Sequence, residues 1–281
     1  MKTNNMDKTG SIAEWLKEAD VVVIGAGAGL SASAGILYSG SRFEENFPEF
    51  IKRYGMTDMY SAGFYPFNSQ AEKWGYWSKH IWLNRYEIGS LPTYQHLLEL
   101  IKDKNYFVIT TNVDHQFLLS GFDEKRFFAT QGDYGLFQCA KACHHRLYDN
   151  EAAVRKMVQM QRECIIPAEL VPTCPVCGGD MEVNIRKDGF FVEDEAWHEA
   201  AERYTKFLED NHNKKILFLE LGVGMNTPVI IKYPFWQMTM KWQNVRYISV
   251  NRDEAYVPKE IAERGIGIAA DISGLLLRLE V

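Results

Sequence analysis

The chain alternates short apolar runs with longer amphipathic stretches, a pattern typical of parallel strands joined by helices. The apolar runs are rich in β-branched and aromatic residues, as strands buried on both faces are. They lie at Val21–Ile24, Tyr106–Ile109, Phe127–Thr130, Lys215–Leu221, Val245–Val250 and Ile266–Ala270. Pro92–Ile101 and Asp194–Asn211 have helical periodicity, and Ser11–Glu14 resembles the start of a short helix ending near Ala19. The pattern predicts an α/β fold: a parallel sheet with helices on both faces.

Glycine or a polar residue follows most of the predicted strands. The first strand runs into Gly25-Ala-Gly-Ala-Gly29 and then into small residues up to Gly35 that suit a helix start. Gly27-x-Gly29-x-x-Ala32 fits the dinucleotide fingerprint of Rossmann-like folds, in which glycines let the backbone approach a pyrophosphate. A glycine-rich turn in an ordinary α/β core is the alternative. We therefore expect a Rossmann-like sheet with a ligand at the carboxyl ends of its strands.

The segment 38–91 departs from this pattern because it is unusually aromatic. The expected second strand with its acidic end is missing, and Tyr38–Pro48 indicates an irregular loop over any bound dinucleotide. The rest of the segment indicates helices broken near Gly55, Gly63 and Pro66. Two interpretations remain open together: a helical lid packed on the sheet, and a hydrophobic wall for an acyl-like or lipid-like substrate arm.

The composition limits the class of protein. The chain has 281 residues, 46% of them hydrophobic, with a net charge of −6 and a pI of about 5.7. We expect neither a nucleic-acid partner nor a membrane surface. Met1–Gly10 is too polar for a signal peptide and no apolar run has the length of a membrane span, so we expect a soluble, cytoplasmic protein. We divide the chain into a dinucleotide-binding domain (1–37, 92–137 and 193–281), an aromatic-rich helical lid (38–91) and a metal-binding module (138–192).

Four of the five cysteines form two local pairs. Cys139-x-x-x-Cys143 and Cys174-Pro-Val-Cys177 supply the four thiolates of a tetrahedral structural zinc site. Two unrelated pairs of buried or redox thiols are the alternative, and His144 and His145 compete as ligands. A closed site of four cysteines leaves no open coordination position, so we expect this zinc to hold the fold together. Cys164 is unpaired and is expected only to pack.

In order along the chain, these motifs resemble those of the sirtuin family. Gly27-Ala-Gly-Leu-Ser-Ala-Ser-Ala-Gly-Ile36 is similar to its glycine-rich loop, and Thr110-Thr-Asn-Val-Asp114 to its Thr-Gln-Asn-Ile-Asp motif. The cysteine pairs stand where the family has its zinc ribbon. The resemblance implies NAD as co-substrate and structural zinc. Its implied cofactor-binding residues are Gly25, Ala26, Gly27, Ala28, Gly29, Ser33, Arg42, Phe43, Asn112, Asp114, Gln131, Gly222, Gly224, Asn251, Arg252, Asp271 and Ile272.

The departures from the family pattern point to a divergent branch. Leu37-Tyr-Ser-Gly replaces Pro-Asp-Phe-Arg, Thr111 replaces a Gln, and Gln131 replaces the catalytic His. With the loop Arg42–Pro48, this pattern resembles the macrodomain-linked class M sirtuins. That resemblance implies a protein ADP-ribosyltransferase acting on a lipoylated carrier related to the glycine-cleavage H protein. A macrodomain hydrolase that removes the mark and a lipoate ligase are its implied pathway partners.

The residues themselves support transfer over deacylation. A deacylase of this fold needs a base that titrates near neutral pH, and the Gln131 amide cannot accept a proton. Transfer requires mainly positioning and charge stabilisation, for which Asn112 and Gln131 are the candidate catalytic residues and Asp114 a carboxamide partner. Structural alternatives are a strand cap for Gln131, a turn for Asn112 and Asp114, and a solvated charge for Arg42. Two other functions stay open: a deacylase with an unusual base and a non-catalytic NAD-binding sensor.

Overall fold

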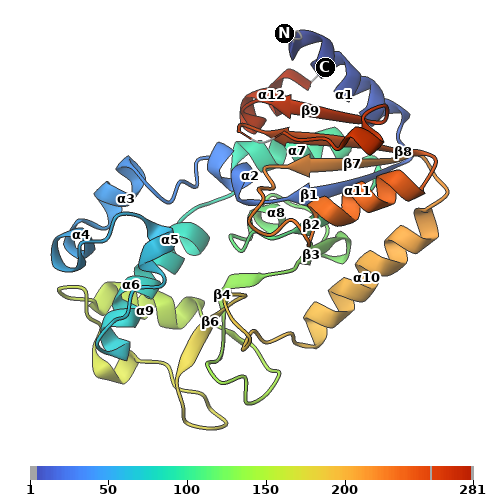
Figure 1. Cartoon of the computed structure of the whole chain (residues 1–281). Helices are drawn as coiled ribbons and strands as arrows, with labels where there is room; N and C mark the ends of the chain where they lie inside the picture. The colour runs from blue at the N-terminus through green and yellow to red at the C-terminus, as the bar shows by residue number, and fades with distance from the viewer. Residues whose placement is uncertain (1–4, 254, 280–281) are drawn as a thin grey trace.

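The computed structural model describes residues 5–253 and 255–279, and its centre is a six-stranded parallel sheet (Figure 1). The strand order is β3-β2-β1-β7-β8-β9. The strands are β1 (Val21–Ala26), β2 (Asn105–Thr110), β3 (Phe127–Ala129), β7 (Ile216–Leu221), β8 (Val245–Asn251) and β9 (Gly265–Ala269). Each coincides with one of the predicted apolar runs. The order reverses between β1 and β7, and open α/β sheets bind ligands at such a point.

Helices cover both faces of this sheet, which confirms the predicted fold class. One face packs on α1 (Asn5–Glu18), α2 (Ala28–Ser33), α7 (Pro92–Ile101), α8 (Gln116–Leu119) and α12 (Ile272–Leu279). The other packs on α10 (Glu195–Asn211) and α11 (Lys232–Lys241). Because side chains alternate along a strand, Val22 and Ile24 join the first layer while Val21 and Val23 join the second. Both faces of β1 are therefore dry.

The first helix begins earlier than the sequence predicts. Ser11 lies inside α1, which starts at Asn5, so the cap pattern at Ser11–Glu14 does not begin the helix. The residues before Ser11 contain no proline, and nothing in the local sequence stops the helix from extending backward. Ile12 and Leu16 fasten the helix by packing into the core beside α12.

The aromatic segment folds into helices beside the sheet (Figure 1). They are α3 (Ser41–Asn46), α4 (Pro48–Tyr54), α5 (Met59–Ala62), α6 (Gln70–Ile81) and the π-helical turn η1 (Trp82–Tyr86). Most of their aromatic rings are buried together in a second core, shared with the small sheet described below. Tyr60 and Phe64 differ, because 68% and 57% of their surfaces are exposed. The segment thus has a packed interior and a partly exposed aromatic edge.

A small antiparallel sheet, in the order β5-β4-β6, stands below the main sheet. It consists of β4 (Gly132–Cys139), β5 (Tyr148–Asp149) and β6 (Met181–Ile185), with α9 (Glu151–Met160) packed against α6. Short 3-10 turns complete the chain: η2 (Glu124–Arg126), η3 (Ala168–Leu170) and η4 (Lys259–Ile261). The expected boundary at residue 138 falls inside β4, which starts directly after Gln131.

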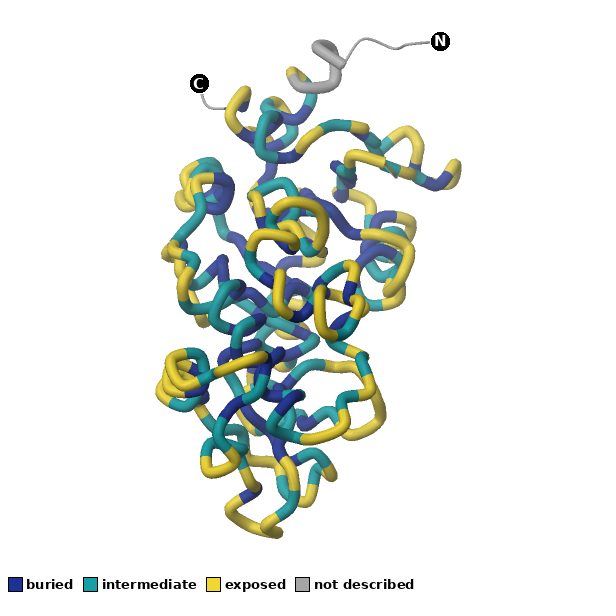
Figure 2. The backbone as a smooth tube through the Cα atoms, turned by 90° about the vertical axis from the view of Figure 1, so that its left-hand side faces the viewer, coloured by how far each residue is buried: buried dark blue, intermediate teal, exposed yellow. Residues whose placement is uncertain are grey.

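Buried residues lie both around the main sheet and between the aromatic helices and the small sheet. Figure 2 shows buried segments inside both the upper and the lower half of the molecule, surrounded by exposed turns. Within residues 5–253 and 255–279, no helix combines the length and the apolar character needed to cross a membrane.

Candidate functional site

A cavity of about 730 Å³ lies at the carboxyl ends of the central strands, between the main sheet and the aromatic helices. The loops after β1, β2 and β7 and the last residue of β8 contribute to it, as the reversal of strand order predicts. Nine of the seventeen predicted cofactor-binding residues line it. They are Gly27, Ala28, Gly29, Asn112, Asp114, Gln131, Gly222, Gly224 and Asn251.

The glycine turn after β1 interlocks with the turn after β7. The Gly29 N–H donates to the Gly222 carbonyl oxygen at 2.9 Å, and a Cβ on Gly27 would lie 2.7 Å from that same oxygen. Gly222 has a φ of +65°, and a Cβ there would lie 2.2 Å from the backbone nitrogen of Leu30. Only glycines let the two turns approach this closely. Their backbones form the floor of the cavity.

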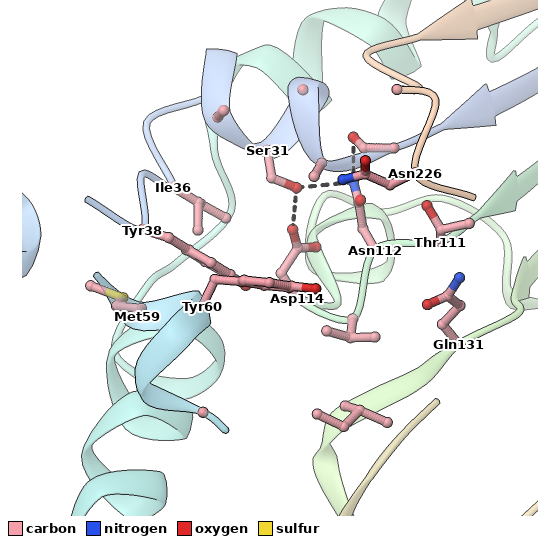
Figure 3. Close-up of a pocket in the computed structure, with 18 of the residues that line it drawn as sticks. Ser31, Ile36, Tyr38, Met59, Tyr60, Thr111, Asn112, Asp114, Gln131 and Asn226 are labelled. Carbon is pink, nitrogen blue, oxygen red and sulfur yellow. Dashed lines mark hydrogen bonds between the residues drawn. The ribbon is translucent and has the colours of Figure 1, made fainter. Parts of the chain in front are cut away.

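The first motif also joins the second motif through Ser31 (Figure 3). The Ser31 hydroxyl donates to the carboxylate of Asp114 and accepts a hydrogen bond from Asn112 Nδ2 at 2.9 Å. Asn112 Nδ2 also donates to the carbonyl oxygen of Gly27 at 3.0 Å. Both amide hydrogens of Asn112 are therefore used, and its side-chain oxygen is the part left for a ligand.

Asp114 is buried at the base of this cluster. Burial raises the pKa of its carboxyl group, and hydrogen bonds from Ser31 and from the Gln116 backbone oppose that rise. The Gln116 N–H lies 3.1 Å from Asp114 Oδ1. The carboxyl group is held in a fixed orientation against the cavity.

Gln131 stands at the junction of the two sheets, between β3 and β4. Its carbonyl oxygen accepts a hydrogen bond from the Arg186 N–H at 3.1 Å, which fixes the backbone. Its side-chain amide points into the space below Thr111 and makes no hydrogen bond to any residue that the structure describes (Figure 3). A neutral amide, free to donate and to accept, is thus presented to the cavity.

The turn that carries Gln131 is braced by charged neighbours. Asp133 Oδ1 accepts from Arg85 Nε at 2.7 Å, and Asp133 Oδ2 lies 2.6 Å from His115 Nδ1. Burial alone would raise the pKa of Asp133, but the hydrogen bond from His115 and the charge of Arg85 outweigh it and hold the pKa low. His115 has a φ of +64°, and this contact ties its loop to β4.

The opposite end of the cavity is aromatic. Its lining includes Tyr38, Tyr60, Phe64, Trp77, His80 and Tyr134. The hydroxyls of Tyr38 and Tyr134 are 2.8 Å apart, and burial raises the pKa of Tyr38 to about 12, so both stay protonated at neutral pH. The cavity therefore has a glycine-lined polar half and an aromatic half.

The loop after β7 closes the polar half and is anchored by a buried ion pair. Gly222, Val223, Gly224, Asn226 and Thr227 line the cavity. At the end of this loop, where helix α11 begins, Lys232 is fully buried and pairs with Glu220 of β7. Ser249 of β8 donates to the same carboxylate oxygen at 2.9 Å. The pair pins both ends of the loop to the sheet.

The other predicted binding residues lie outside the cavity lining. Their contacts are with the protein itself. A Cβ on Gly25 would lie 2.4 Å from Ile231, so this glycine lets α11 pack on β1, in which Ala26 is also buried. Ser33 donates to Asp271 at 2.7 Å and so joins α2 to the start of α12, where Ile272 is buried.

The remaining three belong to the lid or the surface. Arg42 donates to Asn84 Oδ1 at 2.8 Å and to two backbone carbonyls, which holds the loop after α2 against η1. Phe43 stacks on Phe47 in the second core. Arg252 is exposed beside Asp253.

Sequence reasoning missed several cavity residues. Ser31 stands inside the glycine motif. A polar residue at this point of α2, close to the end of β1, is the signal that could have identified it. Tyr38, His80 and Tyr134 carry no local signal, because a His or Tyr among many aromatic residues resembles ordinary core whether it stands in a loop, a helix or a strand.

The four paired cysteines come together at one end of the small sheet. The Sγ atoms of Cys139, Cys143, Cys174 and Cys177 all lie within 4.8 Å of one another. Two of the separations are 3.7 Å, close to the edge of about 3.8 Å expected for a tetrahedron with 2.3 Å zinc–sulfur bonds. His144 Nδ1 contacts the Cys143 sulfur at 3.1 Å from outside this group. The donor set therefore fits a closed zinc site.

Known proteins are similar to this chain in sequence and in fold. No family model matches the sequence. A protein ADP-ribosyltransferase of Staphylococcus aureus (strain Mu50 / ATCC 700699) is 42% identical, over 96% of this chain and 88% of that protein. A probable bifunctional ADP-ribose hydrolase/ADP-ribosyltransferase of Fusarium oxysporum f. sp. cubense is 33% identical, over 90% of this chain and 44% of that protein.

Solved structures extend the comparison. A Sir2 complex with a p53 peptide and NAD+ aligns with a TM-score of 0.56 at 18% identity, over 96% of this chain and 95% of the other. Sir2Tm bound to a propionylated peptide aligns with a TM-score of 0.55 at 19% identity, over 97% of both chains. The fold is thus that of the sirtuins. The chain belongs to the sirtuin family, and the names of both relatives above contain the word ADP-ribosyltransferase.

Proposed function

We propose that this protein is an NAD-dependent protein ADP-ribosyltransferase, which moves ADP-ribose from NAD to a protein acceptor and releases nicotinamide. The observation that carries the proposal is Gln131, a neutral amide that faces the cavity without a partner among the described residues. The name of the Staphylococcus aureus relative, 42% identical over most of both chains, supports it.

The cavity residues suit this chemistry. Transfer breaks the bond between nicotinamide and ribose C1, places positive charge on the ribose and joins C1 to the acceptor, which gives up a proton. The Asn112 side-chain oxygen and the Asp114 carboxyl group offer negative potential where that charge develops. Gln131 orients hydroxyl groups by hydrogen bonding but takes no proton. The interlocked glycine turns line the cavity with backbone groups that a pyrophosphate can approach.

A lipoylated carrier protein related to the glycine-cleavage H protein is the acceptor we propose, as in macrodomain-linked sirtuins. The aromatic half of the cavity supports it, because Tyr60, Phe64 and Trp77 offer apolar surface to a long aliphatic arm. The name of the Fusarium relative, which pairs a hydrolase with a transferase, is consistent with a partner enzyme that removes the mark.

We also propose that zinc holds the small sheet together and takes no part in transfer. Four thiolates fill its coordination shell, which leaves no position for a substrate.

One assay tests the function. The protein is incubated with NAD labelled in the adenosine part, with the carrier in lipoylated or unmodified form, and with an acyl-lysine peptide. We expect label on the lipoylated carrier, one nicotinamide released per label, and no loss of the acyl group. The unmodified carrier is the matched control for the arm.

Other outcomes identify the alternatives. Formation of O-acyl-ADP-ribose would indicate a deacylase, and its rate should then rise in Gln131→His. Tight NAD binding with no nicotinamide release in any mixture would indicate a sensor. If the unmodified carrier is labelled at the same rate, the transferase activity is supported and the proposed requirement for the lipoyl arm is rejected.

A further inference from the structure

His80 places an unsatisfied acceptor in the aromatic half of the cavity. Its side chain belongs to α6, lines the cavity and is 1% exposed. Its Nε2 atom is buried and has no hydrogen-bond partner in the structure. A buried polar atom without a partner destabilises the fold, so an atom left in this state on a residue that lines a cavity points to a ligand group that completes it.

The neighbours of His80 determine which nitrogen carries its proton. The Tyr76 hydroxyl donates to the Met59 carbonyl oxygen at 2.7 Å, an acceptor that has no proton to give. The same hydroxyl lies 3.1 Å from His80 Nδ1. Since the single proton of Tyr76 is used, its oxygen accepts from Nδ1–H. The proton is thus on Nδ1, and Nε2 carries a lone pair.

The surroundings also keep the ring neutral. Burial, with the nearby charge of Arg42 adding to it, lowers the pKa of His80 to about 3. The ring packs edge-on against Tyr38 and Tyr134, with centroids 5.6 and 4.9 Å away. Tyr76, which holds Nδ1, is outside the cavity lining, so Nε2 is the ring nitrogen that remains for a ligand of the cavity.

A spare donor accompanies this acceptor. The Tyr38 and Tyr134 hydroxyls are 2.8 Å apart and share one hydrogen bond, which uses one of their two protons. The second proton has no acceptor among the described residues. One acceptor and one donor therefore belong to rings that pack against each other in the aromatic half of the cavity.

We propose that His80 and the Tyr38–Tyr134 pair form a binding site for a neutral amide group, whose N–H donates to His80 Nε2 and whose carbonyl oxygen accepts from the tyrosine pair. This proposal rests on the proposed function, because the substrates of that function supply two amide groups of this kind. One is the carboxamide of nicotinamide, and the other is the amide that joins an acyl arm to a lysine of the acceptor. His80 acts here as a binding residue and transfers no proton.

Two substitutions distinguish the roles of the two ring nitrogens of His80. In His80→Asn the side-chain amide stands near Nδ1 and keeps a donor for Tyr76, but the Nε2 acceptor is lost. In His80→Gln the amide reaches toward Nε2 and restores an acceptor. We expect KM to rise about tenfold in His80→Asn for the molecule that supplies the amide, with a smaller change in kcat, and to return most of the way in His80→Gln.

The pattern of KM identifies the source. A rise in the KM of NAD, with weaker inhibition by nicotinamide, assigns the carboxamide. A rise only in the KM of the lipoylated carrier assigns the arm. If both variants keep the wild-type KM for NAD and for the carrier, while remaining folded by circular dichroism, ordered water alone fills the site and the proposal is overturned.

A second measurement does not depend on turnover. Nitrogen-15 NMR of the full-length protein with labelled histidine reports the Nε2 resonance of His80, assigned by its loss in His80→Gln. We expect an unprotonated Nε2 whose resonance shifts on saturation with nicotinamide, NAD or the lipoylated carrier. An Nε2 signal unmoved by all three rejects the amide site even if transfer occurs. A shift without transfer keeps the amide site and rejects the proposed function.

Discussion

At the scale of single residues, the side chain of Gln131 decides which proton transfers the cavity supports. Its amide lines the same cavity as Asn112 and Asp114, whose orientation depends on the Ser31 hydroxyl. His80, in the aromatic half of the cavity, does not replace a missing base, because burial and the charge of Arg42 lower its pKa to about 3. The cavity is therefore arranged to hold and polarise a substrate more than to deprotonate it.

Gln131→His tests this division of roles. An imidazole with a pKa near 6.5 would add a group that titrates between pH 6 and 7.5. We expect kcat for transfer in the variant to acquire a step of about tenfold in that range, which the wild type lacks. Gln131→Asn, which keeps an amide, is the control. A wild-type profile with the same step would place a titrating base elsewhere in the cavity.

At the scale of elements, the loop between β7 and α11 depends on a buried charge pair. Lys232 and Glu220 are both withdrawn from water, and each compensates the charge of the other. Breaking such a pair typically costs about 3–5 kcal/mol, because the remaining charge is left without a partner. The loop residues that close the polar half of the cavity are thus held by a contact beneath them.

Lys232→Met should therefore lower the free energy of unfolding by about 3 kcal/mol or more, measured by urea denaturation. The matched control is Lys206→Met, which breaks the exposed pair with Asp210 on α10 and should cost less than about 0.5 kcal/mol. Adding Glu220→Gln to Lys232→Met should recover part of the loss, since the orphaned charge is removed. Equal effects of the two lysine substitutions would contradict this account.

Elements were easier to predict than side-chain roles. Apolar runs and the residues after them located the six strands of the main sheet and the edge where the cavity lies, because both signals are local. The motif around Gly27 did not reveal that Gly25 serves packing against Ile231, or that Ser33 and Asp271 join two helices. Those roles depend on which residues approach from distant parts of the chain, and spacing along the sequence does not report this.

At the scale of the whole molecule, the cysteine cluster and the cavity are connected by one strand. Strand β4 begins at Gly132, next to Gln131, and ends at Cys139. Its partner β6 runs back from Met181, close to Cys177, to Ile185 at the cavity. Hydrogen bonds between the two strands transmit the position of one end to the other.

Removal of the metal should accordingly reduce transfer as well as stability. We expect a strong chelator to lower the melting temperature and to reduce kcat for transfer, with both restored by added zinc. Cys143→Ser should reproduce the effect and make it insensitive to the chelator. A chelated protein that holds no zinc and keeps full activity would show that the strand does not carry the coupling.

The two interlocked turns limit how the sequence of this protein can evolve. A methyl group on Gly27 or Gly222 would strike main-chain atoms of the opposite turn, which no change of rotamer can move aside. Compensation would require both backbones to shift together, and hence several simultaneous mutations. We therefore expect substrate preference to change through the aromatic half of the cavity, where exposed side chains such as Tyr60 and Phe64 can be exchanged one at a time.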